Sequence, residues 1–165
     1  MQSAEPPLLT PAAEPDLRVL MSWFPDANST RIWGGPSFRF PFTFESFAAD
    51  VRWPSMASRC LRDGDRMIAF GQYYDRYHRI NFARLAVHPA RRGGGVGKRL
   101  LALLMQEAVK EMDLAEFSLF VYRDNAPAIA CYKALGFAQS EFPPDAPLKD
   151  VAYYMTRRAR YNSDS

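Results

Sequence analysis

The feature that most constrains this chain is a glycine-rich segment between an apolar run and an amphipathic one. Four of the eight residues at positions 91–98 are glycine, namely Gly93, Gly94, Gly95 and Gly97. Because glycine has no Cβ, the backbone amides of such a segment can approach a ligand that side chains would otherwise keep away. The segment therefore predicts a turn that binds an anion through its main chain.

The flanks of this segment predict a strand before it and a helix after it. Residues 80–87 are compact and apolar, and Pro89 prevents a regular strand from continuing. Beyond the glycines, apolar residues recur at helical spacing: Leu100, Leu101, Leu104, Met105, Ala108 and Met112. We expect a helix over 97–112 that begins at the glycines. The unpaired amides and the positive dipole end of such a helix favour a phosphate or pyrophosphate.

Two common phosphate-binding patterns do not fit this segment. A nucleotide-triphosphate P-loop requires Ser or Thr after Gly-Lys, where this chain has Arg99, and it requires a glycine where this chain has Arg92. A dinucleotide fingerprint requires a third glycine, and Lys98 stands there. The P-loop is therefore excluded, and the dinucleotide fold keeps only weak support.

A different family fits the segment closely. Arg92, Gly95 and Gly97 resemble the Arg-x-x-Gly-x-Gly loop of the GNAT superfamily of N-acetyltransferases, with Val87 and Pro89 before it. After an apolar run at 117–122, a second segment is similar to the family's Asn-x-x-Ala-x-x-x-Tyr-x-x-x-Gly-Phe pattern, through Asn125, Ala128, Tyr132, Gly136 and Phe137. The resemblance covers about residues 57–158 and is best over 83–137.

This resemblance implies an α/β (α+β) fold with a mixed, mostly antiparallel twisted sheet, flanked by helices, whose two central parallel strands splay apart. It also implies acetyl-CoA as the cofactor and no metal. In the family, the loop amides hold the pyrophosphate and a bulged strand binds the pantetheine. The cofactor residues implied here are Leu85, Ala86, Val87, Arg92, Gly93, Gly94, Gly95, Val96, Gly97, Lys98, Asn125 and Tyr132.

Tyr132 is the predicted catalytic residue. A phenol with a reference pKa of ~10 is protonated near neutral pH and can donate a proton to a departing thiolate. Asn125 lies seven residues earlier, so both side chains share one face of the predicted helix, which Asn125 caps and Gly136 ends. A general base is not evident, because residues 81–87 contain no acid; Asp75 and His78 are the nearest candidates, and a water chain is the alternative.

The amine acceptor is expected to bind among the aromatic residues that precede the glycine loop. The candidate contacts are Trp33, Phe38, Tyr73, Tyr74 and His78. The alternative for about half of the aromatic residues in this region is that they pack in the hydrophobic core. The alternative for His78 is that it is a solvent-exposed turn residue without a function. The pattern leaves open whether the acceptor is a peptide or protein amine or a small-molecule amine.

Length, charge and hydropathy bound the remaining possibilities. The 165 residues suit one domain over 1–165, with short loose tails at 1–5 and 160–165. The net charge is +3, and the strongest basic cluster lies at the glycine loop, so a phosphate-bearing cofactor accounts for it without nucleic acid. No run approaches the ~20 apolar residues of a membrane span. We expect a cytoplasmic monomer or homodimer, with Cys60 and Cys131 as buried thiols.

The remaining elements follow from turn and cap signals. Strands are expected at 8–10, 58–62, 66–74, 117–122, 138–142 and 151–157, and helices at 16–24, 29–33 and 44–51, the last capped by Thr43. Asp63-Gly64-Asp65 predicts a hairpin turn. Two other functions stay open: a non-catalytic module that binds coenzyme A and regulates a partner, and an RNA-binding domain.

Overall fold

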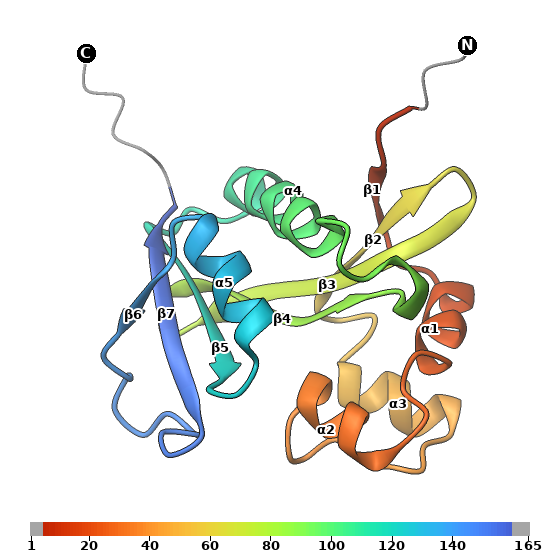
Figure 1. Ribbon diagram of the computed structural model, residues 1–165, viewed down its shortest axis with the longest axis horizontal. Coiled ribbons are helices and arrows are strands. Elements are labelled where there is room, and N and C mark those ends of the chain that lie inside the picture. The colour runs from red at the N-terminus through yellow and green to blue at the C-terminus, as the bar shows by residue number, and fades with distance from the viewer. Residues whose placement is uncertain (1–4, 160–165) are drawn as a thin grey trace. The chain divides into compact units, whose positions relative to one another are not determined.

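The computed structural model describes residues 5–159. In chain order the elements there are β1 (Leu8–Pro11), α1 (Glu14–Met21), α2 (Ala27–Gly34), α3 (Phe44–Val51), β2 (Ala57–Asp63), β3 (Arg66–Arg76), β4 (Arg79–Val87), the 3-10 turn η1 (Pro89–Arg91), α4 (Val96–Glu111), β5 (Glu116–Tyr122), α5 (Ala126–Ala134), β6 (Ala138–Ser140) and β7 (Ala152–Arg158) (Figure 1). The predicted loose tails lie almost wholly outside the described residues.

The strands form one sheet in the order β1-β2-β3-β4-β5-β7-β6. The pair β4 and β5 is parallel, with Ile80 opposite Phe117 and Phe82 opposite Leu119. A parallel pair needs a crossover connection, and α4 provides it. The predicted mixed, mostly antiparallel sheet with flanking helices is confirmed. The splaying of the two central strands stays a prediction.

The chain divides into two compact units, which are described separately. The first comprises residues 1–72 and 84–101, and the second comprises residues 73–83 and 102–165. The strands β3 and β4 and the helix α4 each pass from one unit to the other.

The first unit has an aromatic core that α1 and α3 close. Leu17 and Leu20 of α1 and Phe47 and Val51 of α3 are fully buried, and they belong to one cluster with Phe70 of β3. The start of α3 is fixed by Thr43, whose hydroxyl accepts a hydrogen bond from the Ser46 amide at 3.1 Å. The predicted cap is therefore confirmed.

The second unit is built on β5 and β7, which pair along their whole lengths from Glu116 opposite Arg158 to Tyr122 opposite Ala152. Alternate residues of β5 face opposite sides of the sheet. On one side, the buried Ser118 hydroxyl donates to the Asn81 side-chain oxygen at 3.1 Å, which satisfies a polar group inside the unit.

Several boundaries differ from the sequence predictions. The first helix begins at Glu14 and ends at Met21, because the Asp16 side chain accepts from the Ala13 amide at 2.8 Å and so fixes an earlier start. The helix after the glycines begins at Val96, one residue early. The strand predicted at 138–142 ends at Ser140, ahead of Pro143 and Pro144, which cannot donate to a ladder.

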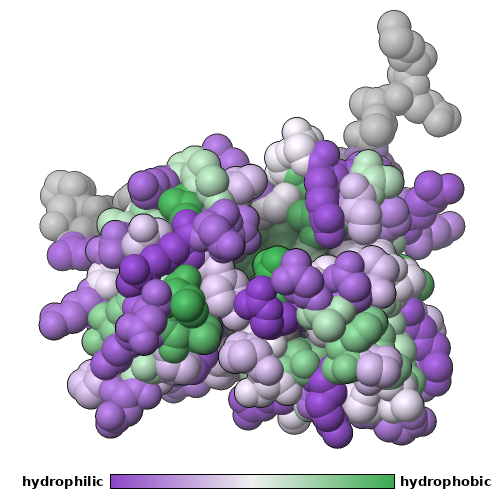
Figure 2. Space-filling view, turned by 60° about the horizontal axis from the view of Figure 1, so that its bottom comes forward, coloured by the Kyte–Doolittle hydropathy of each residue, from purple (hydrophilic) through white to green (hydrophobic). Residues whose placement is uncertain are grey.

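The described residues contain no helix that is long and apolar enough to cross a membrane. Figure 2 shows hydrophilic residues over much of the face that it draws, with apolar residues in smaller patches between them.

Candidate functional site

The glycine segment forms an exposed loop that leads directly into α4. Gly93 and Gly95 have φ angles of +81° and +80°, a region that is costly for residues with a Cβ. The first hydrogen bond of the helix runs from the Arg99 amide to the Gly95 carbonyl at 3.1 Å. The two glycines are therefore needed to reverse the chain between η1 and α4.

Backbone amides at the start of α4 have no hydrogen-bond partner among the described residues. Over the described residues, no hydrogen bond is found for the amides of Val96, Gly97 or Lys98, as expected for the first turn of a helix. A Cβ placed on Gly95 would meet no atom within 4 Å, so open space borders the loop. The helix start is thus an accessible group of donors with a favourable dipole for an anion.

The loop lies against the end of β4. A Cβ placed on Gly97 would lie 3.5 Å from Cγ2 of Val87, so the fold brings these two predicted site residues together. Arg91 forms an ion pair at 3.0 Å with Asp63, the last residue of β2, which ties the beginning of the loop to the β2–β3 hairpin. Leu85 and Val87 are partly exposed, whereas Ala86 is buried.

A distortion in β4 immediately precedes these residues. Arg84 has a φ of +51°, in the left-handed region, although it stands inside a strand. Its guanidinium donates to the Gln72 side-chain oxygen at 2.9 Å. The Gln72 amide nitrogen in turn donates to the Val51 carbonyl and the Ser58 hydroxyl, each at 2.8 Å. This buried network holds the strained residue in place.

Sequence reasoning missed both Arg84 and Gln72. The amino-acid composition of a strand does not indicate that one of its non-glycine residues has a positive φ. The only hint was the bulged strand that the family resemblance implied at residues 85–87, next to Arg84.

Two further predicted cofactor residues, Asn125 and Tyr132, lie in the second unit, the first as the cap of α5 and the second within it. The Asn125 side-chain oxygen accepts from the Ala128 amide at 3.4 Å, which confirms its predicted role as the helix cap. Gly136, with a φ of +92°, follows the end of the helix as predicted. None of the residues of α5 is fully buried although most are apolar, so the helix leaves apolar side chains partly exposed.

Tyr132 lies in the last turn of α5, and its ring packs edge-on against Phe137 at 6.3 Å between centroids. Burial raises the pKa of the Tyr132 phenol, and the neighbouring Cys131 adds to this effect. Within residues 5–159 no partner is found for its hydroxyl. The phenol is therefore a protonated donor at neutral pH, and no described residue accepts a hydrogen bond from it.

The candidate acceptor contacts divide between the units. In the first unit, Trp33 stacks on Phe24 at 4.2 Å and on Phe47 at 5.7 Å between ring centroids, and it is only partly buried. Its indole nitrogen is buried without a hydrogen-bond partner in the described part of the chain. Phe38 lies in the same cluster and is 9% exposed. Of Trp33 and Phe38, only Trp33 has a polar side-chain atom, and this indole nitrogen has no partner in the described part of the chain.

In the second unit, Tyr73 belongs to the core. Its side chain is 1% exposed, and its hydroxyl donates to Glu111 at 2.6 Å. We therefore assign neither Tyr73 nor Phe38 to acceptor contact. Tyr74 is partly exposed and accepts from Arg76, whereas His78 is exposed at the turn between β3 and β4. Asp75, the other base candidate, is also exposed.

Two further predictions concern cysteines and metals. Cys60 is fully buried, and burial raises the pKa of its thiol to about 12, so it is inert as a nucleophile. Cys131 is only partly buried, which differs from the prediction. Among the described residues no group of His, Cys, Asp and Glu side chains could hold a metal ion.

Comparison with known families decides the assignment. A model of the Acetyltransferase (GNAT) family matches residues 26–137, which include the glycine loop, Asn125 and Tyr132. This chain belongs to the GNAT family. The family identity predicted from the two motifs is therefore confirmed.

Solved structures share the GNAT fold at low sequence identity. The ribosomal-protein-S18-alanine N-acetyltransferase from Escherichia coli has a TM-score of 0.65 and 22% identity, over 96% of this chain and 97% of that one. A spermidine N-acetyltransferase from Vibrio cholerae, in complex with CoA and spermine, has a TM-score of 0.72 and 16% identity, over 93% and 95%. The aminoglycoside acetyltransferase AAC(6′)-Ib, with paromomycin and acetyl-CoA, has a TM-score of 0.74 and 18% identity, over 98% and 100%.

The raised pKa of Tyr132 predicts a pH-dependent stability. The phenol ionises in the unfolded chain near pH ~10 but only at higher pH in the folded protein, so folding favours the protonated form. The stability of the wild type should therefore fall, relative to that of Tyr132→Phe, as the pH rises above ~10, while the difference stays constant below about pH 9. Urea unfolding of both proteins across this pH range measures the difference between their free energies of unfolding.

Tyr77→Phe, at an exposed turn position, controls for loss of a hydroxyl. A stability difference between the wild type and Tyr132→Phe that does not change above pH ~10 would contradict the burial of this phenol.

Proposed function

We propose that this chain is an N-acetyltransferase that moves an acetyl group from acetyl-CoA to a primary amine by direct attack. The observation that carries the proposal is the accessible helix start at Val96, preceded by two glycines with positive φ, in a chain of the GNAT family. The GNAT structures with coenzyme A or acetyl-CoA support the choice of cofactor.

The loop fits the diphosphate part of coenzyme A. The amides of residues 93–98 are available, and Cβ positions on Gly93 and Gly95 have no atom within 4 Å. Arg92, Lys98 and Arg99 are exposed nearby in the chain and add positive charge. Neutral amides, a helix dipole and cations together favour a diphosphate over an uncharged ligand. We assign Arg92 to Lys98 and the backbone of Leu85 to Val87 to cofactor binding, together with Asn125.

Acetyl-CoA, when bound, supplies an activated thioester. The protein then needs to polarise the carbonyl group, remove a proton from the amine and protonate the departing sulfur. The Val87 amide is our candidate for the first task, since it lies beyond the Arg84 distortion in β4. Tyr132 is our candidate for the last, because its phenol stays protonated and has no partner in the described chain.

We assign no buried side chain as the general base. Asp75 and His78 are exposed, and β4 carries no acid from Asn81 to Val87. We therefore propose that the proton leaves through a chain of water molecules, with Asp75 and His78 as the candidate titratable side chains.

The acceptor is proposed to be a peptide or small-molecule amine. The similar structures act on a ribosomal protein, a polyamine or an aminoglycoside, so the fold alone does not select among these classes. Trp33, Tyr74 and His78 are the proposed contacts. The family match runs through both compact units, which supports a single transferase domain over the chain.

The first test is an acceptor panel. The purified chain is incubated with acetyl-CoA and pooled peptides, polyamines and aminoglycosides, while free thiol and acceptor mass are followed. We expect thiol release with a 42-Da mass gain on an amine for at least one class. The Tyr132→Phe variant should lose ~10²–10⁴-fold in kcat with little change in the KM for acetyl-CoA.

Binding of acetyl-CoA without turnover on any acceptor would favour the non-catalytic regulatory module. An unchanged kcat for Tyr132→Phe would remove the acid role from this residue while leaving the transferase activity intact.

A matched pair of glycine variants tests the loop. Gly95→Ala places a Cβ on a residue with a φ of +80°, whereas Gly94→Ala has an ordinary φ and would approach Arg91 only to 3.8 Å. A left-handed alanine costs ~1–2 kcal/mol, so Gly95→Ala should weaken acetyl-CoA binding about 5–30-fold as the loop rearranges. Gly94→Ala should bind within about twofold of the wild type.

Isothermal titration with acetyl-CoA gives both dissociation constants. Equal weakening by the two variants would mean that the left-handed loop conformation is not what binds the cofactor.

A further inference from the structure

The left-handed residue of β4 follows closely on the end of the parallel pairing of this strand. In the register of β4 with β5, the last pair is Phe82 opposite Leu119, although β5 continues to Tyr122. Arg84 comes two residues later, with a φ of +51°. A residue with a Cβ is disfavoured in this conformation, so contacts of its side chain or its neighbours have to hold it there. Residues 85–87, which we assign to the cofactor, follow directly.

The Arg84 guanidinium is anchored to a glutamine on the neighbouring strand β3. Its Nη1 donates to Oε1 of Gln72 at 2.9 Å and to the sulfur of Met56 at 3.8 Å. Arg84 is partly buried, whereas Gln72 is fully buried. The bond between the two side chains is therefore shielded from water, and a hydrogen bond from a charged donor is stronger there than at an exposed site.

The orientation of the Gln72 amide is fixed by its other contacts. Its Nε2 donates to the Val51 carbonyl and to the Ser58 hydroxyl, each at 2.8 Å. A backbone carbonyl only accepts hydrogen bonds and a guanidinium only donates them, so the amide nitrogen has to face Val51 and the amide oxygen has to face Arg84. Turning the amide over would place acceptor against acceptor and donor against donor. The glutamine is thus a rigid anchor for the arginine.

Helix α3 adds an electrostatic contribution to this anchor. Asp50 accepts from Arg39, at 3.1 Å from Nε and at 3.0 Å from Nη2. Burial raises the pKa of the Asp50 carboxyl, but the hydrogen bonds and charge of Arg39, together with the charge of Arg84, lower it overall. Asp50 is therefore ionised at neutral pH and attracts the Arg84 guanidinium from α3.

From these contacts we infer that Gln72 and Arg84 are positioning residues, which hold β4 in its left-handed conformation at residue 84 and thereby keep the backbone of residues 85–87 in the conformation that binds the pantetheine arm of acetyl-CoA. The inference rests on the proposed function, because it concerns the same cofactor. Neither side chain needs to touch the cofactor in this role. Binding of the diphosphate by the loop at 92–98 should not depend on the network.

The test compares two ligands that share the diphosphate. Acetyl-CoA carries the pantetheine arm, whereas 3′-phosphoadenosine 5′-diphosphate lacks it. Isothermal titration of the full chain with each ligand gives two dissociation constants, and their ratio measures the contribution of the arm. A general loss of folded protein would affect both ligands alike and leave this ratio unchanged. We expect the wild type to bind acetyl-CoA about tenfold or more tightly than the shorter ligand, because main-chain hydrogen bonds to the arm add affinity.

Two substitutions of Arg84 separate the backbone conformation from the side chain. Arg84→Ala removes the guanidinium but leaves a Cβ at a φ of +51°, whereas Arg84→Gly removes the same group and adopts this φ readily. Arg84→Ala should reduce the affinity ratio about 5–30-fold, which corresponds to the preference of such a residue against the left-handed region. Arg84→Gly should reduce it only about twofold, because glycine populates positive and negative φ about equally.

Gln72→Met and a control variant complete the series. Gln72→Met removes the anchor while keeping the length of the side chain, so it should reduce the ratio in the same direction as Arg84→Ala. Adding Arg84→Gly to it should bring the ratio back to that of Arg84→Gly alone. Arg52→Ala is the matched control, because Arg52 is an exposed arginine at the end of α3 with a φ of +62°. It should leave the ratio within about twofold of the wild type.

Equal reductions in Arg84→Ala and Arg84→Gly would overturn the inference, since the backbone conformation would then not be what matters. An unchanged ratio in Arg84→Ala would also overturn it, as would an equal loss in Arg52→Ala. Should Arg84→Ala or Gln72→Met fail to fold, the other variant, compared with Arg84→Gly, decides the matter.

The same titrations distinguish this inference from the proposed function. Binding of neither ligand by the wild type would overturn the proposed function together with the inference. Binding of acetyl-CoA with the same affinity ratio in the wild type and in every variant would overturn the positioning role alone.

Discussion

The structure depends on how the chain reverses between β4 and α4. Two residues with φ near +80°, Gly93 and Gly95, allow a helix to begin at Val96 directly after the turn at Arg91. The first-turn amides then have no partner in the described chain, and Val87 lies next to Gly97. Any residue with a Cβ at the two left-handed positions would strain this turn. A strand end and a helix start are thereby joined so that both offer main-chain groups to one ligand.

Much of this arrangement could be predicted from the sequence because it is local. The caps formed by Thr43 and Asn125 and the helix stop at Gly136 follow from the chemistry of single residues, and the structure confirms all three. The hairpin turn at Gly64 is confirmed too, as is the helix after the glycines. Each of these depends on residues within four positions of one another, which a sequence displays directly.

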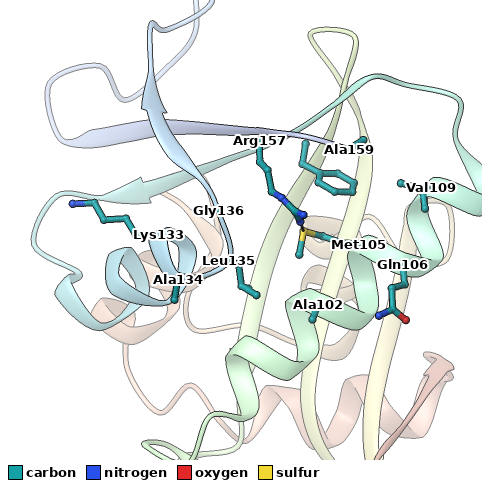
Figure 3. A pocket seen from close by; sticks show the side chains of 11 residues that line it. Ala102, Met105, Gln106, Val109, Lys133, Ala134, Leu135, Gly136, Arg157 and Ala159 are labelled. Carbon is teal, nitrogen blue, oxygen red and sulfur yellow. Dashed lines mark hydrogen bonds between the residues drawn. The ribbon is translucent and has the colours of Figure 1, made fainter. Parts of the chain in front are cut away.

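The features that could not be predicted depend on contacts between distant segments. The strain at Arg84 is held by Gln72, which is itself bonded to Val51 and Ser58. The aromatic residues before the loop could not be sorted by composition, because burial of Tyr73 and Phe38 follows from packing. The pocket in the second unit that Arg157 lines combines α4, β5, the end of α5 and β7, so no short motif marks it (Figure 3).

The central claim is that free peptide groups at the start of α4 bind the diphosphate of the cofactor. The most direct measurement is an amide-resolved NMR titration with desulfo-coenzyme A, which retains the diphosphate but cannot transfer an acetyl group. The account predicts large, saturable downfield shifts for the amides of residues 93–98, as expected for new hydrogen bonds to an anion. Saturable binding that leaves these amides unchanged, with shifts confined to other parts of the chain, would contradict it.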